Sequence, residues 1–183
     1  LEDSDSKSEL KRDLLTMTRI VDQLLKVAQL EAFILETDQH ADLCAIATDA
    51  ASRLGHLAVD QGKSISVIAP EKPVFVHGDS IILQHGLTNL VENALSHTPK
   101  GKTVEITVKA GGTIHVDDEG PGVPEADRTL VFQRFWRKSR NSSGAGIGLS
   151  IVSKIAEAHG GSIQVSSSPK GGARFSLVLR STL

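Results

Sequence analysis

Apolar residues recur with a helical period in four stretches of the chain. In residues 8–36 the steps between apolar positions alternate between four and three, which is typical of the seam of a helical hairpin or coiled coil. One such helix cannot bury this face alone, so we expect it to pack on a partner helix, with packing on its own domain as the alternative. Three further helices are predicted in residues 43–57, 79–99 and 147–159, which stop at Gly62, Pro99 and Gly160.

Between and after these helices, apolar and polar residues alternate with the period of β-strands. The runs are residues 64–69, 74–78, 103–118 (a hairpin that turns at Gly111-Gly112), 162–168 and 173–180. We therefore expect residues 38–183 to form an α+β domain. It is a two-layer α/β sandwich, with a mixed, mostly antiparallel sheet and three helices on one face, preceded by one long helix in residues 1–37.

The composition fits one soluble domain with a small appendage. The chain has 183 residues, of which 39% are apolar, and the net charge of -2 gives no field that would gather nucleic acid. The single cysteine, Cys44, excludes an internal disulfide and fits a reducing compartment. No run approaches the roughly 18 apolar residues of a membrane span. We expect a cytoplasmic fragment cut from a larger parent protein that is itself membrane-anchored.

The helix in residues 79–99 carries an unusual polar stripe. His85, Asn89, Asn93 and His97 recur at every fourth position, opposite an apolar arc, and Asn lowers helix propensity. One interpretation is that the stripe faces solvent. The other is that the amide oxygens face a polar cavity, where they bind a cation or a nucleotide.

Two glycine-rich segments suggest ligand contacts. Asp118 follows a predicted strand and precedes Gly120 and Gly122, so its carboxylate can accept a hydrogen bond from an exocyclic amine, although a plain turn is the alternative. Gly144, Gly146 and Gly148 lead directly into a helix, whose free amides would bind phosphate. A flexible connector is the alternative there, and the spacing matches neither the dinucleotide fingerprint nor the Walker loop.

Between these segments, aromatic and basic residues alternate in a lid segment, residues 126–145. We expect Phe132 and Phe135 to anchor this segment while Arg137 and Lys138 reach anionic ligand groups. We also expect it to be mobile without nucleotide. Nucleic-acid binding by this short patch is disfavoured because the chain is slightly acidic.

Four sequence elements now stand in a fixed order along the chain: the helix with the polar stripe, the segment after Asp118, the lid segment and the glycines before the last helix. In this order they resemble the N, G1, F and G2 boxes of sensor histidine kinases. The ATP-binding domain of these kinases has the Bergerat fold of the gyrase, Hsp90, kinase and MutL group. Residues 38–183 resemble this catalytic domain, and residues 8–36 resemble the second helix of the dimerisation and histidine-phosphotransfer hairpin.

The resemblance implies a role for each matching residue. Asn93 would be the principal Mg²⁺ ligand, with Asn89 as a further ligand directly or through water. Asp118 would bind the adenine amine, and Arg137 would reach the γ-phosphate as the second catalytic group. The remaining nucleotide contacts would come from His97, Gly120, Gly122, Gly144, Gly146, Gly148 and Leu149.

Three departures from the family pattern qualify this assignment. Ser96 stands where a basic residue is common, so Arg137 or Lys138 would have to compensate. Asn89 stands where hydrolytic relatives carry a catalytic Glu, so slow hydrolysis and transfer to His are expected. None of the seven histidines has the sequence context of the phosphoacceptor, so this chain should not autophosphorylate by itself.

The resemblance therefore implies the ATP-binding kinase core of a two-component sensor. It would use ATP and Mg²⁺ to phosphorylate a His on the hairpin of the parent kinase, as a homodimer, for relay to an Asp of a response regulator. One alternative is an ATPase switch or chaperone-like domain of the same fold. The other is a module that binds a transition metal through the polar stripe, where amides are weak ligands.

Overall fold

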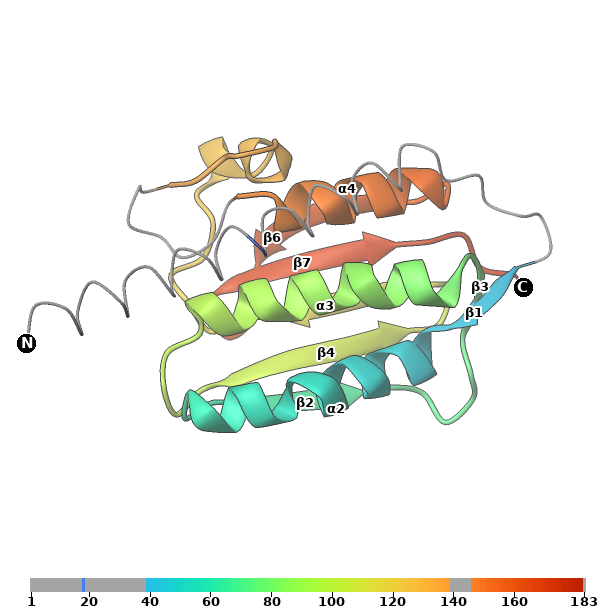
Figure 1. The fold of residues 1–183 in the computed structure, drawn as a ribbon, viewed down its shortest axis with the longest axis horizontal. Coiled ribbons are helices and arrows are strands. Elements are labelled where there is room, and N and C mark those ends of the chain that lie inside the picture. The colour runs from blue at the N-terminus through green and yellow to red at the C-terminus, as the bar shows by residue number, and fades with distance from the viewer. Residues whose placement is uncertain (1–17, 19–38, 139–145, 183) are drawn as a thin grey trace, which may run out of the picture.

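The computed structural model describes residues 18, 39–138 and 146–182. Its main body is a sheet covered on one face by three helices (Figure 1). The elements are β1 (His40–Asp42), α2 (Leu43–Asp60), β2 (Ser64–Ile68), β3 (Phe75–His77), α3 (Ser80–His97), β4 (Thr103–Lys109), β5 (Thr113–Asp117), η1 (Glu125–Asp127), η2 (Leu130–Phe132), α4 (Gly148–Ala158), β6 (Ser162–Ser167) and β7 (Ala173–Val178).

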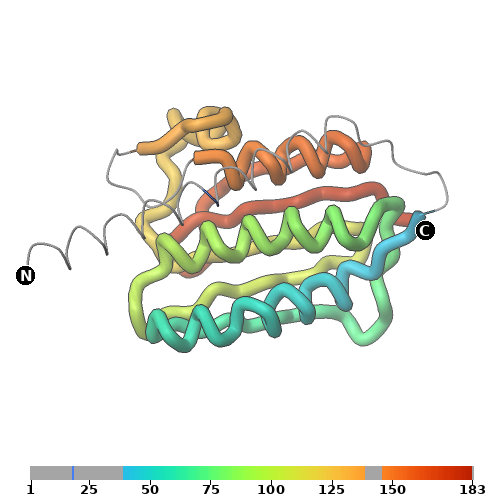
Figure 2. The backbone as a smooth tube through the Cα atoms, in the orientation of Figure 1, coloured from blue at the N-terminus to red at the C-terminus, as the bar shows by residue number. Residues whose placement is uncertain are grey.

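The sheet has five strands in the order β2-β4-β5-β7-β6. The pair β2 and β4 is parallel, and all other neighbours are antiparallel. The backbone trace in Figure 2 shows α2, α3 and α4 side by side across this sheet. The predicted fold class, a two-layer α/β sandwich with a mostly antiparallel sheet, is confirmed.

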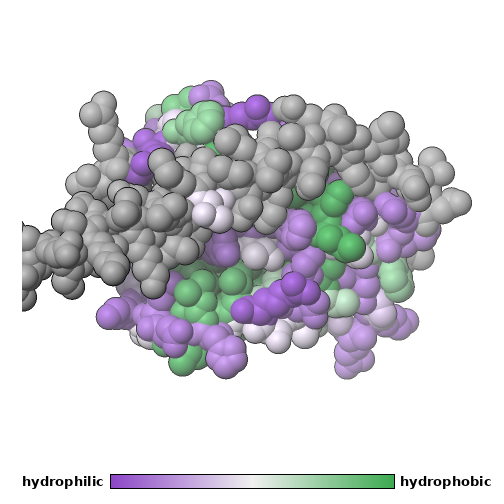
Figure 3. Space-filling model, in the orientation of Figure 1, coloured by the Kyte–Doolittle hydropathy of each residue, from purple (hydrophilic) through white to green (hydrophobic). Residues whose placement is uncertain are grey.

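The apolar face of each helix packs into an aliphatic core. In α3 the predicted arc is buried, since Leu83, Leu87, Leu90 and Val91 are all at most 1% exposed. Where Figure 3 shows this face in colour, hydrophilic and hydrophobic side chains lie side by side. This binary pattern explains why the helical period was visible in the sequence.

Two of the helices begin at aspartate caps. The side chain of Asp42 accepts a hydrogen bond from the Cys44 amide at the start of α2. At the start of α3, Asp79 accepts hydrogen bonds from the amides of Ile81 and Ile82 at 2.8 and 3.0 Å. These caps satisfy amides that the first helical turn leaves without a partner.

The structure differs from the predicted elements at the edge of the domain. β1 was not predicted, and β3 pairs with β1 in a separate two-stranded sheet instead of joining the main sheet. The predicted helix in residues 8–36 lies outside the described residues, apart from Thr18. Among the described helices, none has the length and apolar character needed to cross a bilayer.

Candidate functional site

A cavity of about 740 Å³ lies where the C-terminal half of α3 meets the start of α4. It brings together all the predicted site residues that the structure describes except Gly120, which does not line it. Gly144 lies outside the described residues. The predicted residues in the cavity wall are Asn89, Asn93, His97, Asp118, Gly122, Arg137, Gly146, Gly148 and Leu149.

The polar stripe of α3 supplies one wall of this cavity. The Asn89 side-chain nitrogen donates a hydrogen bond of 3.1 Å to the His85 carbonyl, which leaves its amide oxygen for other partners. A Cβ atom added to Gly148 would lie 3.7 Å from that oxygen, so Asn89 faces the start of α4. Asn93 also lines the cavity, whereas His85 does not. Part of the stripe therefore faces the cavity, as the second interpretation expected.

Asp118 directly follows the last residue of β5, Asp117, and is only 2% exposed. Its Oδ1 atom accepts hydrogen bonds from the amides of Gly120 and Ala173 at 2.8 and 3.0 Å. Both of these bonds fall on Oδ1, so Oδ2 is the oxygen available to a ligand in the cavity. Gly120 lies behind this carboxylate, and a Cβ atom there would lie 2.7 Å from the His97 carbonyl oxygen.

The start of α4 forms the opposite wall and, unlike α2 and α3, has no side-chain cap. Ile147 occupies the cap position, and the first turn contains no acidic residue. Gly146, which precedes it, has a φ of +69°, a left-handed conformation that favours glycine. Uncapped amides at a helix N-terminus attract anions, because the helix dipole adds to the open hydrogen-bond donors. This end of the cavity is therefore suited to phosphate.

The part of the lid segment that the structure describes attaches differently from our prediction. Phe132 does anchor it, through an edge-to-face contact with Phe175 at a centroid distance of 6.3 Å. Phe135 does not, because its side chain is 62% exposed, on a backbone with a left-handed φ of +64°. Trp136 packs against the core and lines the cavity instead. The prediction that both phenyl rings anchor the segment was wrong.

Cationic side chains reach the cavity from the same segment. Arg137 and Lys138 both line it, and a Cβ atom added to Gly146 would lie 3.1 Å from Cγ of Arg137. The Phe135 amide donates a hydrogen bond of 2.9 Å to the Gly146 carbonyl, which ties the described part of the lid segment to the residues just before α4. The cations thus lie next to the uncapped start of α4.

Sequence reasoning missed several residues of the cavity wall. Leu57 and Gln61 at the end of α2, and Asp127 in η1, belong to no recognisable motif, and only their place in the fold brings them there. Trp136 had a usable signal, because it is the single tryptophan of the chain and lies beside the basic residues.

Glu119 was also missed, and it fixes the loop that carries Asp118. Its Oε1 atom accepts a hydrogen bond of 3.1 Å from the Thr103 amide, and Oε2 lies 3.0 Å from Nζ of Lys102. The Thr103 amide first, and then Lys102, lower the pKa of this carboxyl below its usual range. The loop after β5 is therefore tied to the start of β4.

The donor set fits Mg²⁺ only as part of a nucleotide complex. Within the described residues, no group of three or more His, Cys, Asp or Glu side chains is placed to hold a metal ion. The amide oxygens of Asn89 and Asn93 are hard ligands of the kind that Mg²⁺ accepts, but they are too few for a protein cage. Phosphate and water oxygens would complete the coordination.

Comparison with known proteins identifies relatives among sensor kinases. The probable sensor histidine kinase TcrY of Mycobacterium tuberculosis is 37% identical over 160 residues, which are 84% of this chain and 33% of TcrY. The sensor protein kinase PmrB of Pseudomonas aeruginosa is 35% identical over 161 residues, 85% of this chain and 33% of PmrB. The chain thus spans about a third of the length of these relatives.

Solved structures share the fold. The mycobacterial sensor histidine kinase MprB superposes with a TM-score of 0.68 at 28% identity, over 78% of this chain and 97% of that one. Full-length ShkA in complex with AMPPNP superposes with a TM-score of 0.76 at 25% identity, over 100% of this chain and 40% of ShkA. The family model of histidine kinase-, DNA gyrase B- and HSP90-like ATPases matches residues 78–183. The chain therefore belongs to this ATPase family, as its four motifs predicted.

Proposed function

We propose that the cavity binds Mg-ATP and that the chain is the catalytic core of a two-component sensor histidine kinase. One observation carries the proposal. The uncapped start of α4 lies next to the amide oxygen of Asn89, in the wall of a cavity that Asp118 also lines with an open carboxylate oxygen. A phosphate site and an amine acceptor in one cavity are what an adenine nucleotide requires.

Each wall of the cavity would bind one part of the nucleotide. Oδ2 of Asp118 would accept a hydrogen bond from the adenine amine, and the first amides of α4 would bind phosphate oxygens. Asn93, with Asn89 beside it, would hold Mg²⁺, which neutralises phosphate charge when bound. Arg137 and Lys138 would add positive charge near the transferred group. Trp136 would keep water from that end of the cavity.

These residues favour transfer over hydrolysis. Phosphoryl transfer requires positioning and charge neutralisation rather than a strong nucleophile from the protein. The amide of Asn89 cannot act as a base towards water. The acceptor would be a His on the hairpin of the parent kinase, since none of the seven histidines here has the phosphoacceptor context.

A second candidate is slow ATP hydrolysis in the same cavity. Glu92 lines the cavity next to Asn93, and its side chain is exposed, so a carboxylate is available to orient water. This candidate differs from the first in one product, because the label from γ-labelled ATP would appear as free phosphate and not on a histidine.

Binding is tested with a fluorescent ATP analogue, with and without Mg²⁺. We expect Asn93→Ala to lose most of the Mg²⁺-dependent affinity and to retain most of the affinity seen in EDTA. Gly55→Ala is the matched control, because a Cβ atom at this helical position meets nothing within 4 Å. Equal affinity of wild type and Asn93→Ala in Mg²⁺ would remove Asn93 from the site.

Transfer is tested by mixing the chain with a separately made dimerisation hairpin that carries the acceptor His. With γ-labelled ATP, acid-labile label on the hairpin supports the kinase, and label in free phosphate alone supports the ATPase. Adding a receiver domain should then move the label to an Asp. The proposal also includes this relay to a response regulator. The parent kinase would be a homodimer anchored in the membrane, with the kinase core in the cytoplasm.

A further inference from the structure

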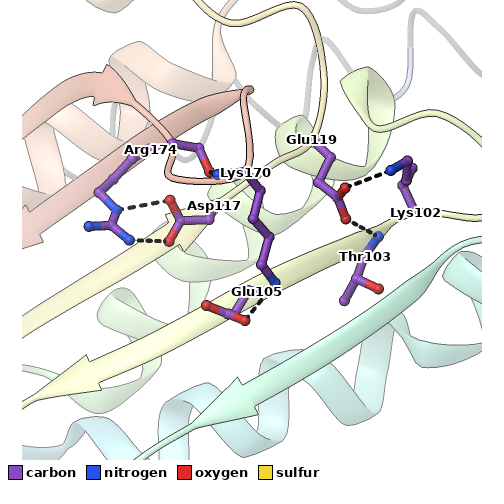
Figure 4. A network of polar contacts seen from close by, with 8 residues as sticks. Lys102, Thr103, Glu105, Asp117, Glu119, Lys170 and Arg174 are labelled. Carbon is purple, nitrogen blue, oxygen red and sulfur yellow. Dashed lines mark hydrogen bonds and ion pairs between the residues drawn. The ribbon is translucent and has the colours of Figure 1, made fainter.

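Neighbouring aspartates at the end of β5 point to opposite faces of the sheet. Asp118 faces the cavity, and Asp117 faces the side without helices, as the alternation of a strand requires. Asp117 is 2% exposed and receives two hydrogen bonds of 2.8 Å from Arg174 of β7. Figure 4 shows this two-point ion pair beside the single-contact ion pair between Lys170 and Glu105.

The cavity side of the same junction is unusually tight. The Asp118 amide donates a hydrogen bond of 2.9 Å to the Ala173 carbonyl, and the Ala173 amide returns one of 3.0 Å to Oδ1 of Asp118. A Cβ atom added to Gly172 would overlap the main-chain oxygen and Oδ1 of Asp118. Only glycine at this position lets the turn between β6 and β7 pack directly behind the carboxylate.

Ion pairs on the face of the sheet without helices hold the β6–β7 turn in place. Glu105 and Asp117 lie directly opposite each other on β4 and β5, where two like charges would repel. Lys170, in the turn, lies 2.8 Å from Glu105, and Arg174, just after the turn, neutralises Asp117. The two acids therefore bind the β6–β7 turn and the start of β7 to the neighbouring strands, directly behind Asp118.

We propose that the β6–β7 turn, through Gly172, Ala173 and Arg174, positions Asp118 and thereby sets a preference for purines with an exocyclic amine. The turn occupies Oδ1 and leaves Oδ2 as an acceptor with a fixed direction. A 6-amino purine can donate to that oxygen, whereas a 6-oxo purine would place its own oxygen against it. The inference rests on the proposed role of Asp118 in adenine binding. Gly172 and Arg174 are positioning residues, since they act through Asp118.

The test compares ATP with inosine triphosphate, which carries an oxygen in place of the amine. We expect the wild-type chain to prefer ATP by about tenfold or more, because the 6-oxo group leaves a buried charged acceptor unpaired. In Gly172→Ala and Arg174→Gln this ratio should fall towards one, mainly through weaker ATP binding. A purely structural role would instead weaken both nucleotides alike and leave the ratio unchanged, which would overturn the proposal.

Control variants separate the possible failures. Gly55→Ala should keep the wild-type ratio, since its Cβ atom would meet no neighbour. Asp118→Asn should abolish the preference. If Asp118→Asn still prefers ATP, the proposed role of Asp118 in adenine binding is wrong. If Asp118→Asn loses the preference but Gly172→Ala and Arg174→Gln keep the wild-type ratio, Asp118 binds adenine and the turn does not position it.

A rescue experiment covers the case in which Arg174→Gln folds poorly. Removing Arg174 leaves Asp117 as a buried charge without a partner, and Asp117→Asn in the same chain removes that charge. The double variant should regain stability while its nucleotide ratio stays near one, because two neutral side chains hold the register less firmly. A double variant with both wild-type stability and the wild-type ratio would contradict a positioning role for the pair.

Discussion

Replacing Gly146 with alanine tests the geometry of the phosphate end of the cavity. A Cβ atom at Gly146 would lie 2.6 Å from the main-chain oxygen of Trp136 and 2.9 Å from the main-chain carbon of Phe135. Both neighbours are backbone, so no side-chain rotation can relieve the contact. The substitution must move either the start of α4 or the lid segment.

The expected cost has two parts. Holding alanine at a φ of +69° costs about 1–2 kcal/mol. Relieving an overpacked contact typically costs another 1–3 kcal/mol or so. If the free variant relieves both costs by shifting this backbone, and phosphate binding requires the original position, the lower sum of about 2 kcal/mol opposes binding and corresponds to an affinity loss of roughly 30-fold.

Gly160→Ala is the matched control for this variant. Gly160 has a φ of +64° at the far end of α4, and a Cβ atom there meets nothing within 4 Å. It bears the same conformational cost without the contact, so the difference between the two variants isolates the steric part. Titration with a fluorescent ATP analogue measures affinity, and thermal unfolding measures stability. The reasoning is refuted if Gly146→Ala binds within about threefold of Gly160→Ala, because 3-fold is only about 0.7 kcal/mol.

Three further predictions concern stability. Nε2 of buried His159 accepts the Asp79 amide at 3.2 Å, and burial lowers the pKa of His159 below its usual value of 6.5. The unfolded chain therefore protonates this histidine more readily than the folded chain does. The contribution of neutral His159 to the free energy of unfolding should be fully present above pH 6.5 and decrease progressively below it. Urea unfolding between pH 5 and 7.5 should show this slope in wild type and a flatter one in His159→Gln; equal slopes would count against it. Gly78→Ala should cost about 1–3 kcal/mol, because its Cβ atom would lie 2.6 Å from the His159 ring, and an unchanged unfolding midpoint would contradict this. Phe135→Gly should cost less than about 1 kcal/mol, since it removes an exposed ring and left-handed strain, whereas Phe132→Ala should cost more, and the reverse order would show that Phe135 is the anchor.

The layers of the fold could be predicted because the spacing of apolar residues in each long helix and strand shows the period of that element. The change from period 3.6 to period 2 at residues 103–118 marks the hairpin of β4 and β5, which the structure confirms. β1 could not be predicted in this way, because a strand of three residues is shorter than two alternations. The pairing of β3 with β1 was equally hidden, because it joins segments more than 30 positions apart and depends on where α2 ends.

Site residues could be predicted where the residue type is unfavourable for the local backbone structure. Asn89 and Asn93 lower helix propensity, and Gly146 adopts a conformation that other residues avoid, so each calls for an explanation in the sequence itself. Leu57 and Gln61 carry no such cost, and they reach the cavity only because α2 packs beside α3. Phe135 was misinterpreted because a spacing of three residues implies one face only in a continuing helix, and η2 ends before it.

The three helices that cover the sheet begin in different ways, and the difference follows the cavity. Asp42 and Asp79 satisfy the first amides of α2 and α3, which start away from the ligand. α4 starts at the cavity wall with Ile147 and no cap, so its first turn keeps open donors that a side chain would otherwise satisfy. A carboxylate cap there would stabilise the free chain, but it would also occupy the amides and repel phosphate. The missing cap is thus a local loss of stability that a bound anion would offset, and it places the least satisfied helix end where binding energy can be gained.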